Sequence, residues 1–359
     1  MDSIFAKRRG ALKEALCEAG FGALLISSPA TRYYYSGFEL HDPQPNESAG
    51  HLLIAANGDD WLCTDARYLD AARRLWDPER IFIYSAAPFT SMGEFFSGRF
   101  SAPVGFEAKT LSLAAWEGLS GALKGCELRR ADGLADRFRL RKDEDEISRM
   151  RRSCALNQQM LEWLPSQWGG EPSETELAWA VERYFREHGA SELAFASIVA
   201  YGPNAALPHA IPSPQVRVLP GGPLLADVGC RVDGYCSDQT RTFWIGEKPA
   251  DHFRRALELT QEAQKRAIAL IRPGVRACDV YAAAWEYFAA HGVEKAFTHG
   301  LGHGVGLETH EGPSLNGRNT SPLEAGMIVT VEPGLYYPEW GGVRWEHMVL
   351  VTEDGAEIL

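Results

Sequence analysis

The sequence has few cysteines and no pattern among them. The seven cysteines, at positions 17, 63, 126, 154, 230, 236 and 278, are an odd number, and no two of them form a Cys-x-x-Cys pair. This scatter argues against a disulfide framework and against a zinc–thiolate site. Reduced thiols are typical of the cytoplasm, which is the compartment that we expect.

The chain also lacks a long apolar run and a concentrated basic face. No stretch approaches the roughly 18 apolar residues of a membrane span, and residues 1–10 are not followed by the apolar run of a signal peptide. The formal net charge is -12. Nucleic acids and anionic membranes call for clustered Lys and Arg, so we expect neither as a partner. The basic residues of segment 137–152 alternate with acidic ones, which is typical of a solvated helix face.

The chain is long enough for two domains, because its 359 residues exceed the usual size of one domain. In residues 1–132, short apolar runs alternate with helical patterns, which predicts an α/β domain. The strands are expected at 23–26, 52–55, 61–63, 81–84 and 104–106, and the helices at 3–19, 68–76 and 113–123.

Residues 133–359 have a different pattern. A charged segment, 134–146, is expected to be the linker and the start of a long helix that runs to Leu164. Ser173 and Glu176 have the spacing of a capping box and predict the start of the next helix. Further helices are expected at 251–271 and 279–290, with strands at 195–200, 223–245, 326–332 and 342–352. This order predicts an α+β domain with a mostly antiparallel sheet and helices on one face.

A hairpin brings two aspartates together. Asp233-Gly234 is a signal for a type I′ turn, and a two-residue turn there would pair Val232 with Tyr235. Because side chains alternate along a strand, Asp227 and Asp238 then point to one face, diagonally across the hairpin. Two carboxylates in otherwise apolar strands repel each other and normally need a cation between them. The alternative is a pair of aspartates on a hydrated sheet face.

A second hairpin repeats this logic with glutamates. Glu332 and Glu346 are equidistant from Glu339, so a hairpin centred at Glu339 places them opposite each other. This pair alone fits two interpretations equally well: metal ligands, or a surface pair together with Arg344.

Histidines gather in a segment rich in glycine. His299 and His303 lie in the segment 298–306, which contains four glycines and is expected to be a loop, and His310 follows it. The glycines remove neighbouring side chains and allow the backbone to approach a ligand closely. Phosphate binding is a weaker interpretation, because no Lys-Ser/Thr follows. A further histidine, His209, lies in a loop that its neighbouring prolines predict.

Four carboxylates and one histidine are a ligand set for moderately hard divalent ions. Mn²⁺, Co²⁺ and Zn²⁺ are the candidates, and no thiolate favours zinc alone. Two such ions about 3.5 to 4 Å apart can activate water and polarise a carbonyl group, which is metal-assisted hydrolysis.

These residues resemble the pita-bread metallopeptidases of family M24, in particular Xaa-Pro dipeptidases and aminopeptidase P. The resemblance covers nearly the whole chain and is carried by segments 202–204 with 208–209, 227–242, 302–307 with 310–311, 332–334 and 342–346. It implies a creatinase-like α/β amino-terminal domain, which is similar to segments 33–38 and 64–68, followed by an α+β pita-bread catalytic domain.

The resemblance also implies a ligand set for two divalent ions, with Mn²⁺ favoured over Co²⁺ or Zn²⁺. The implied ligands are Asp227, Asp238, His303, Glu332 and Glu346. By the same resemblance, Asp238 and Glu346 would bridge both ions, and Glu332 would also transfer the proton of the bridging water.

Four further residues match active-site positions of the family. His209 and His310 match histidines that contact the substrate and stabilise the tetrahedral intermediate, His299 matches a histidine that lines the pocket, and Arg344 matches an arginine near the metal site. Arg344 is also a candidate partner for the free carboxylate of a dipeptide, the alternative being an ion pair with a metal-binding glutamate.

The implied activity is hydrolysis of the bond between a first residue and a proline in short peptides, with dipeptides favoured. Aminopeptidase P activity on longer peptides and a non-catalytic peptide-binding module are the alternatives. Creatine amidinohydrolase does not keep the five ligands, and methionine aminopeptidase normally lacks such an amino-terminal domain. The resemblance further implies a homodimer, because this domain commonly completes the site of the partner subunit.

Three positions depart from the family pattern. Gln239 replaces an apolar residue, Trp345 an aliphatic one and His347 an aspartate, and none of these changes removes a ligand. His347 is expected to alter hydrogen bonding around the metal ligands. An apolar wall for the proline ring is expected from Tyr336, Trp340 and Trp345.

Overall fold

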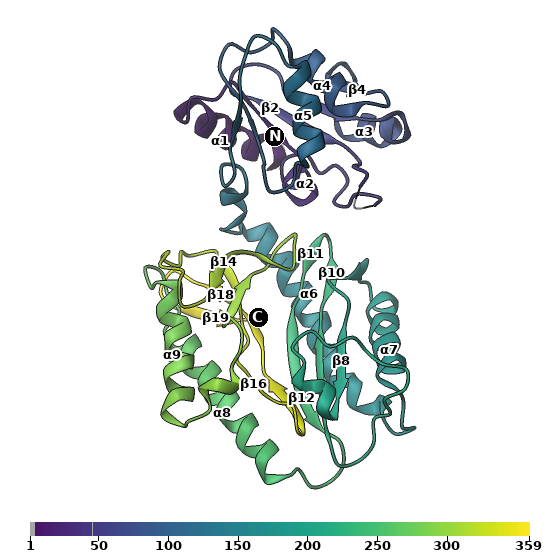
Figure 1. Cartoon of the computed structure of the whole chain (residues 1–359), viewed down its shortest axis with the longest axis vertical. Helices are drawn as coiled ribbons and strands as arrows, with labels where there is room; N and C mark the ends of the chain where they lie inside the picture. The colour runs from purple at the N-terminus through teal and green to yellow at the C-terminus, as the bar shows by residue number, and fades with distance from the viewer. Residues whose placement is uncertain (1–3, 45) are drawn as a thin grey trace. The chain divides into compact units, whose positions relative to one another are not determined.

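The computed structural model describes residues 4–44 and 46–359, in two compact units. The units are Met1–Arg139 and Leu140–Leu359, where the sequence predicts a boundary between residues 132 and 133. Figure 1 shows both units along the chain. Among the described residues, no helix combines the length and the apolar character that crossing a bilayer requires.

The first unit is an α/β domain around one six-stranded sheet with the order β4-β3-β2-β1-β5-β6. Its strands are β1 (Ala23–Ile26), β2 (His51–Ala55), β3 (Trp61–Thr64), β4 (Ile81–Ile83), β5 (Val104–Phe106) and β6 (Leu128–Arg130). Its helices are α1 (Ile4–Glu18), α2 (Pro29–Ser36), α3 (Leu69–Leu75), α4 (Pro88–Phe96) and α5 (Leu113–Ala122). The pairs β1–β5, β5–β6 and β3–β4 are parallel, as is usual where helices connect strands.

The sequence did not predict α2, α4 and β6. Both helices are short and begin at a proline, which taken alone is a loop signal. Proline suits the first helical position, however, because the N–H that it lacks has no partner in the helix there. At α2 the preceding Ser28 supplies the cap, since its hydroxyl accepts a 3.3 Å hydrogen bond from the backbone N–H of Thr31.

The second unit is built from antiparallel strands. They are β7 (Glu192–Leu193), β8 (Ile198–Tyr201), β9 (Pro223–Val228), β10 (Cys230–Val232), β11 (Tyr235–Cys236), β12 (Gln239–Trp244), β13 (Gly302–Gly304), β14 (Glu311–Leu315), β15 (Ile328–Val331), β16 (Gly334–Tyr337), β17 (Gly341–Arg344), β18 (His347–Val351) and β19 (Ala356–Ile358). They form sheets of the orders β11-β10-β7, β12-β9-β8, β14-β13-β15-β18-β19 and β16-β17.

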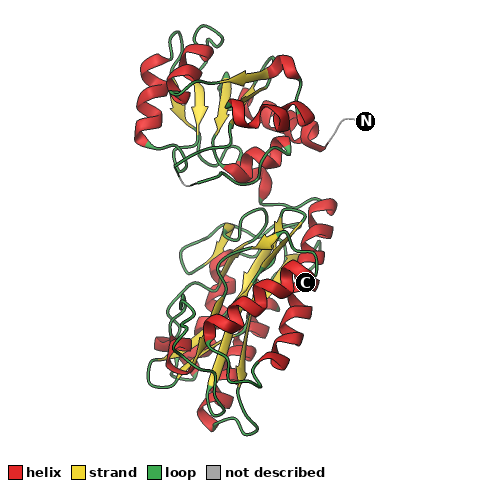
Figure 2. Cartoon of the chain, turned by 90° about the vertical axis from the view of Figure 1, so that its right-hand side faces the viewer, coloured by secondary structure: helices red, strands yellow, loops and turns green. Residues whose placement is uncertain are grey.

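Four long helices cover these strands. They are α6 (Glu144–Trp163), α7 (Glu174–Glu187), α8 (Asp251–Ile268) and α9 (Ala277–Ala290). The predicted capping box of Ser173 and Glu176 is confirmed at the start of α7. Helix α6 packs on β10–β12 and α8 on β15–β17, so each hairpin described below has its own helix. Figures 1 and 2 show the helices of this unit packed against its strands.

The first hairpin has the predicted register. Asp233 and Gly234 have φ angles of 50° and 86°, as a type I′ turn requires, and Val232 pairs with Tyr235. Beyond an interruption, Val228 pairs with Gln239 in the same register. Asp238 lies in this interruption, where the strands leave one sheet and enter another.

The second hairpin has the same construction. Val331 pairs with His347 on one side of an interruption, and Gly334 pairs with Arg344 on the other. Glu332 and Glu346 lie between these pairs and oppose each other, as the predicted centre at Glu339 requires.

Threonines join the two hairpins. The backbone N–H of Glu346 donates to the carbonyl of Thr240 at 3.2 Å, and the N–H of Arg344 donates to the hydroxyl of Thr242 at 3.1 Å. Arg241, between the threonines, adds to these contacts, because its Nη1 donates to the carbonyl of Thr240 at 2.9 Å and to the carbonyl of Glu346. The two carboxylate-bearing hairpins therefore lie side by side at the centre of the unit.

Candidate metal centre

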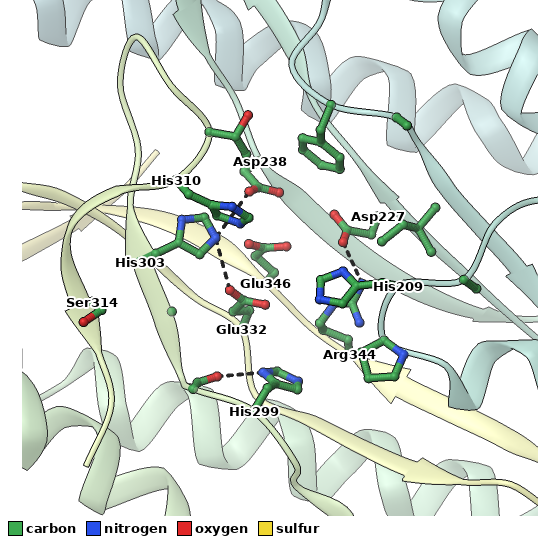
Figure 3. A pocket seen from close by; sticks show the side chains of 18 of the residues that line it. His209, Asp227, Asp238, His299, His303, His310, Ser314, Glu332, Arg344 and Glu346 are labelled. Atoms are coloured by element: carbon green, nitrogen blue, oxygen red, sulfur yellow. Dashed lines mark hydrogen bonds and ion pairs between the residues drawn. The ribbon is translucent and has the colours of Figure 1, made fainter. Parts of the chain in front are cut away.

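A cavity of about 630 Å³ opens between the two hairpins. It is lined by all nine residues that the sequence singled out for a site: His209, Asp227, Asp238, His299, His303, His310, Glu332, Arg344 and Glu346. Figure 3 shows the four carboxylates and the ring of His303 turned toward a common centre. The assembly thus combines residues that are more than a hundred positions apart in the chain.

His303 faces the carboxylates with its Nε2 atom. This nitrogen is 3.4 Å from Oε1 of Glu332 and 3.7 Å from Oδ2 of Asp238. The other ring nitrogen, Nδ1, lies 3.1 Å from the carbonyl of Gly304 and must donate there. Nε2 therefore carries a lone pair, and burial together with the neighbouring His310 lowers the pKa of His303 to about 4. A neutral imidazole of this kind is a metal ligand.

Three of the predicted ligands form a compact donor group. Asp238, His303 and Glu346 each offer an atom within 4.8 Å of the others. Glu332 lies next to this group, and its Oε1 accepts a 3.2 Å hydrogen bond from the hydroxyl of Thr330. These donors are those that suit a moderately hard divalent ion.

Burial makes these carboxylates unfavourable as bare anions. Burial, and after it the charge of Glu346, raises the pKa of Asp238 well above its usual range. Burial, and after it Glu332, does the same to the pKa of Glu346. Burial also raises the pKa of Glu332 to about 8. A bound cation would remove this penalty, so the residues fit a metal site.

Asp227 divides its two oxygens between different roles. Oδ2 accepts a 2.6 Å hydrogen bond from Nη2 of Arg344. Oδ1 is buried and has no hydrogen-bond partner among the described residues. A buried carboxylate oxygen without a partner is costly, and an ion would satisfy it.

Arg344 uses its other nitrogens as well. Nη1 donates to the hydroxyl of Tyr336 at 2.8 Å and Nε to the hydroxyl of Thr240 at 3.1 Å. Three of the five N–H groups of the guanidinium are thus used within the protein, and its ion pair is with Asp227 and not with a glutamate. The candidate role of Arg344 as the partner of a free substrate carboxylate stays a prediction, for which the remaining N–H groups at the cavity would be used.

Within the glycine-rich segment, residues 302–304 form the short strand β13, where the sequence predicted a loop. His303 lies in the middle of β13, between Gly302 and Gly304. A Cβ atom on Gly302 would come within 2.0 Å of the carbonyl oxygen of Thr330, and one on Gly304 within 1.9 Å of that of Gly312. The glycines therefore allow the neighbouring strands to approach His303 closely.

The other three histidines surround the carboxylates. The ring of His310 meets that of His303 edge-on, with centroids 4.1 Å apart. Nδ1 of His299 is 2.7 Å from the carbonyl of Gly300, so Nε2 accepts from the hydroxyl of Tyr336 at 2.8 Å. His209 approaches from the opposite side, beside Asp227, as Figure 3 shows.

The predicted aromatic wall is wrong, because none of its three residues lines the cavity in the described chain. Tyr336 is tied to Arg344 and His299, Trp340 stacks on Tyr337 with centroids 5.1 Å apart, and Trp345 lies against the guanidinium of Arg241. The apolar side chains at the cavity are instead Phe195, Ile198, Pro208 and Ile211. Pro208 precedes His209 in one of the motifs, whereas Phe195, Ile198 and Ile211 lie outside them, so no local signal marked those three.

Glu174 is a second residue that the sequence left unmarked. It is buried in the first turn of α7 and accepts from the backbone N–H groups of Tyr201 and Ser213, at 2.6 and 2.9 Å. Both its oxygens also accept from the side-chain amide of Asn204, each at 3.1 Å. Glu174 thus fixes both ends of the loop that carries His209. In the sequence it is only one acid in the first turn of a helix.

Comparison with known proteins gives matches over both units. Residues 8–141 match the Creatinase/Prolidase N-terminal domain, and residues 148–353 match metallopeptidase family M24. An uncharacterized peptidase of Bacillus subtilis is 30% identical over 344 residues, which is 96% of this chain and 95% of that protein.

Two solved structures are similar over nearly their whole length. The Xaa-Pro dipeptidase from Bacillus anthracis has a TM-score of 0.90 and 31% identity, covering 99% of this chain and 97% of the other. The X-Pro aminopeptidase from Thermotoga maritima has a TM-score of 0.87 and 31% identity, covering 98% and 96%. The predicted fold class, a creatinase-like α/β domain followed by an α+β pita-bread domain, is confirmed.

Proposed function

The chain belongs to metallopeptidase family M24, and we propose that it hydrolyses the bond between a first residue and a proline in short peptides, with dipeptides favoured. The observation that carries this proposal is the cavity in which four carboxylates and the lone pair of His303 converge. The similarity to an Xaa-Pro dipeptidase supports the substrate class.

We assign the ligands of two divalent cations to the residues around this centre. They are Asp227, Asp238, His303, Glu332 and Glu346. The raised pKa values of Asp238, Glu332 and Glu346 and the unpartnered Oδ1 of Asp227 support this assignment. Mn²⁺ is the ion that we favour, with Co²⁺ or Zn²⁺ as alternatives. The bound cations would supply an activated water and polarise the scissile carbonyl.

The chain's own residues supply the proton transfers. Glu332 is placed to accept a proton from water and to deliver it to the proline nitrogen, since its carboxylate lies beside His303 at the cavity. His310 and His209 line the cavity from two sides, and we assign to them hydrogen bonds to the carbonyl oxygen as it gains charge. His299 completes the wall beside Glu332.

The proline ring needs an apolar surface, because its nitrogen has no hydrogen to donate. Phe195, Ile198 and Pro208 provide such a surface at the cavity. The hydrophobic effect of burying the ring there favours proline over residues that would leave this apolar surface exposed to water.

The decisive experiment compares Ala-Pro, Ala-Pro-Ala and Ala-Ala as substrates after the metal-free protein is loaded with Mn²⁺, Co²⁺ or Zn²⁺. We expect Ala-Pro to have the highest kcat/KM, Ala-Ala to be a poor substrate, and a chelator to abolish hydrolysis. Equal cleavage of Ala-Ala would refute the specificity for proline. Absence of hydrolysis with every metal would leave the non-catalytic peptide-binding module as the function.

Aminopeptidase P activity is the second candidate. Identity to the X-Pro aminopeptidase equals identity to the dipeptidase, at 31%. Ile211 also lines the cavity with 87% of its surface exposed, and could contact a residue beyond the proline. A kcat/KM for Ala-Pro-Ala at or above that for Ala-Pro would decide for the aminopeptidase.

We further propose a cytoplasmic homodimer. The seven cysteines are free, which suits a reducing compartment. Light scattering after size-exclusion chromatography should give twice the mass of one chain, and a monomeric mass would contradict the dimer.

A further inference from the structure

Gln264 on α8 connects the two strands that carry the glutamates. Its side chain is buried, and its Nε2 lies 2.7 Å from the carbonyl oxygen of Val331 and 3.0 Å from that of Trp345. These are the residues directly before Glu332 and Glu346. One amide group therefore spans the hairpin at the position of both carboxylates.

Arg241 fixes the direction of every hydrogen bond in this group. A guanidinium only donates, so Nε2 of His347, 2.8 Å from Nη2 of Arg241, must accept. Nδ1 of His347 then carries the hydrogen and donates to Oε1 of Gln264 at 3.1 Å. The amide nitrogen of Gln264 must accordingly face Val331 and Trp345, where it donates twice. Each donor in this series meets an acceptor.

The bridge lies where, among the described residues, the hairpin keeps a single backbone hydrogen bond of its own, from the N–H of Trp345 to the carbonyl of Pro333 at 3.3 Å. The ladder stops at the pair Val331–His347 and resumes at Gly334–Arg344. In the interruption, the N–H of Glu332 donates to Leu301 and the N–H of Glu346 to Thr240, both outside the hairpin. Gln264 therefore adds two hydrogen bonds to the single backbone bond between the strands at the glutamates, and its amide helps to set the strand spacing there.

We propose that Gln264, oriented by His347 and Arg241, is a positioning residue that sets the separation of the Glu332 and Glu346 carboxylates for cation binding. The inference rests on the proposed function only in taking these two carboxylates as metal ligands. It also gives His347 a role: where the family has an aspartate, this chain has a ring that accepts from Arg241 and donates to Gln264. A carboxylate at that position could accept from Arg241 but could not donate to Gln264.

The test uses Gln264→Met, which keeps the length of the side chain and removes all three hydrogen bonds. The control is Thr260→Val, on the same helix, where the buried hydroxyl has no hydrogen-bond partner among the described residues. Binding of Mn²⁺ alone to metal-free protein is measured by calorimetry, and folding by circular dichroism. We expect Gln264→Met to weaken Mn²⁺ binding roughly 10- to 100-fold and the control to bind as the wild type does.

A second variant covers the case in which Gln264→Met does not fold. His347→Phe keeps a ring in place and removes only the donor to Gln264 and the acceptor for Arg241, so we expect a smaller loss of Mn²⁺ affinity in the same direction. Wild-type Mn²⁺ affinity in both variants would overturn the inference, even if their melting temperatures fell. Failure of the wild type to bind Mn²⁺ would instead overturn the proposed function.

Discussion

Arg344 and Asp227 share one short hydrogen bond that leaves half of the aspartate unused. The bond joins Nη2 and Oδ2 across 2.6 Å, and the buried Oδ1 has no partner among the described residues. The pair fixes the orientation of Asp227 and leaves its other oxygen for an ion. An aspartate that is held in this way loses less rotational freedom on binding an ion.

Arg344→Lys should therefore weaken the metal centre although the charge is kept. A lysine cannot donate to Asp227, Tyr336 and Thr240 together, because it lacks the planar fork. We expect Mn²⁺ affinity to fall about tenfold, in the range seen for partners of metal ligands. Calorimetry on metal-free protein measures this directly, and unchanged affinity would show that Asp227 is oriented by other contacts.

Asp238→Asn should lose most activity and yet stabilise the metal-free protein. The variant removes a carboxylate that we assign as a metal ligand, and polarisation of the carbonyl by the metal contributes on the order of several kcal/mol, so kcat should fall about 100-fold or more. Without metal, the buried charge near Glu346 is a penalty that asparagine does not carry. Activity and the melting temperature in chelator are the two measurements. Wild-type activity would refute the ligand assignment.

His209→Ala and His310→Ala should lower kcat and leave the metal content nearly intact. Both side chains are assigned to the substrate, so each loss should be about 100- to 1,000-fold, as for the removal of a donor to an oxyanion. Metal is quantified by atomic emission after dialysis. Loss of metal from His310→Ala would place that residue among the ligands, because it already contacts His303.

Glu174→Gln should act through His209. Glu174 accepts from three donors: the backbone N–H groups of Tyr201 and Ser213 and the side-chain amide of Asn204. In the glutamine variant one acceptor oxygen becomes an NH₂ group, which would face these donors and could not accept from them. In the otherwise wild-type protein, we expect Glu174→Gln to lower kcat about tenfold. A small displacement of a group close to the reacting atoms lowers the rate by up to about 100-fold. In a His209→Ala background the same change should add little.

Glu182→Gln on the same helix is the control for this prediction. In the part of the chain that the structure describes, Glu182 pairs only with the exposed Arg186, and surface pairs of this kind contribute little to stability. Its kcat should equal that of the wild type. A full additional loss from Glu174→Gln in the His209→Ala background would show that Glu174 acts on the fold as a whole.

The stability of the metal-free protein should fall as the pH rises from about 6.5 to about 8. In the folded state the pKa of Glu332 is about 8, above its usual value of 4.5, so the folded chain binds more protons than the unfolded chain. Stability is then lost as the pH rises through the folded pKa. His303, with a folded pKa of about 4 against a usual 6.5, acts in the opposite direction, but only below about pH 6.5.

The measurement is the melting temperature in chelator across this pH range, with and without saturating Mn²⁺. Mn²⁺ should remove the decline, because bound carboxylates no longer need protons. If the melting temperature of the metal-free protein rises with pH between about 6.5 and 8, the decline in stability that we attribute to the raised pKa of Glu332 is contradicted.

Local signals in the sequence were sufficient for the two hairpins. Asp233-Gly234 specifies its own turn, and the symmetry about Glu339 specifies the second register, so the opposition of Glu332 and Glu346 followed from counting. The start of α7 followed likewise from its capping box. In each case the deciding contacts are only a few residues apart.

Contacts between distant segments could not be predicted in this way. Strand β13 was expected to be a loop, because its glycines have meaning only beside Thr330 and Gly312. Gln264 and Glu174 are ordinary helix residues until their partners, many positions away, are known. The apolar wall was assigned to the nearest aromatic residues, whereas the cavity is lined by Ile198 on β8 and by Phe195 in the segment before that strand.

The division of the carboxylates between two hairpins has a consequence for the order of folding. Asp227 and Asp238 are joined by a short loop, and so are Glu332 and Glu346, so each pair can form early at a small entropic cost. Docking of the hairpins closes a much longer loop and brings four like charges together, which makes it the slow step. Mn²⁺ should therefore slow unfolding strongly and accelerate refolding only as far as the docked centre exists in the transition state.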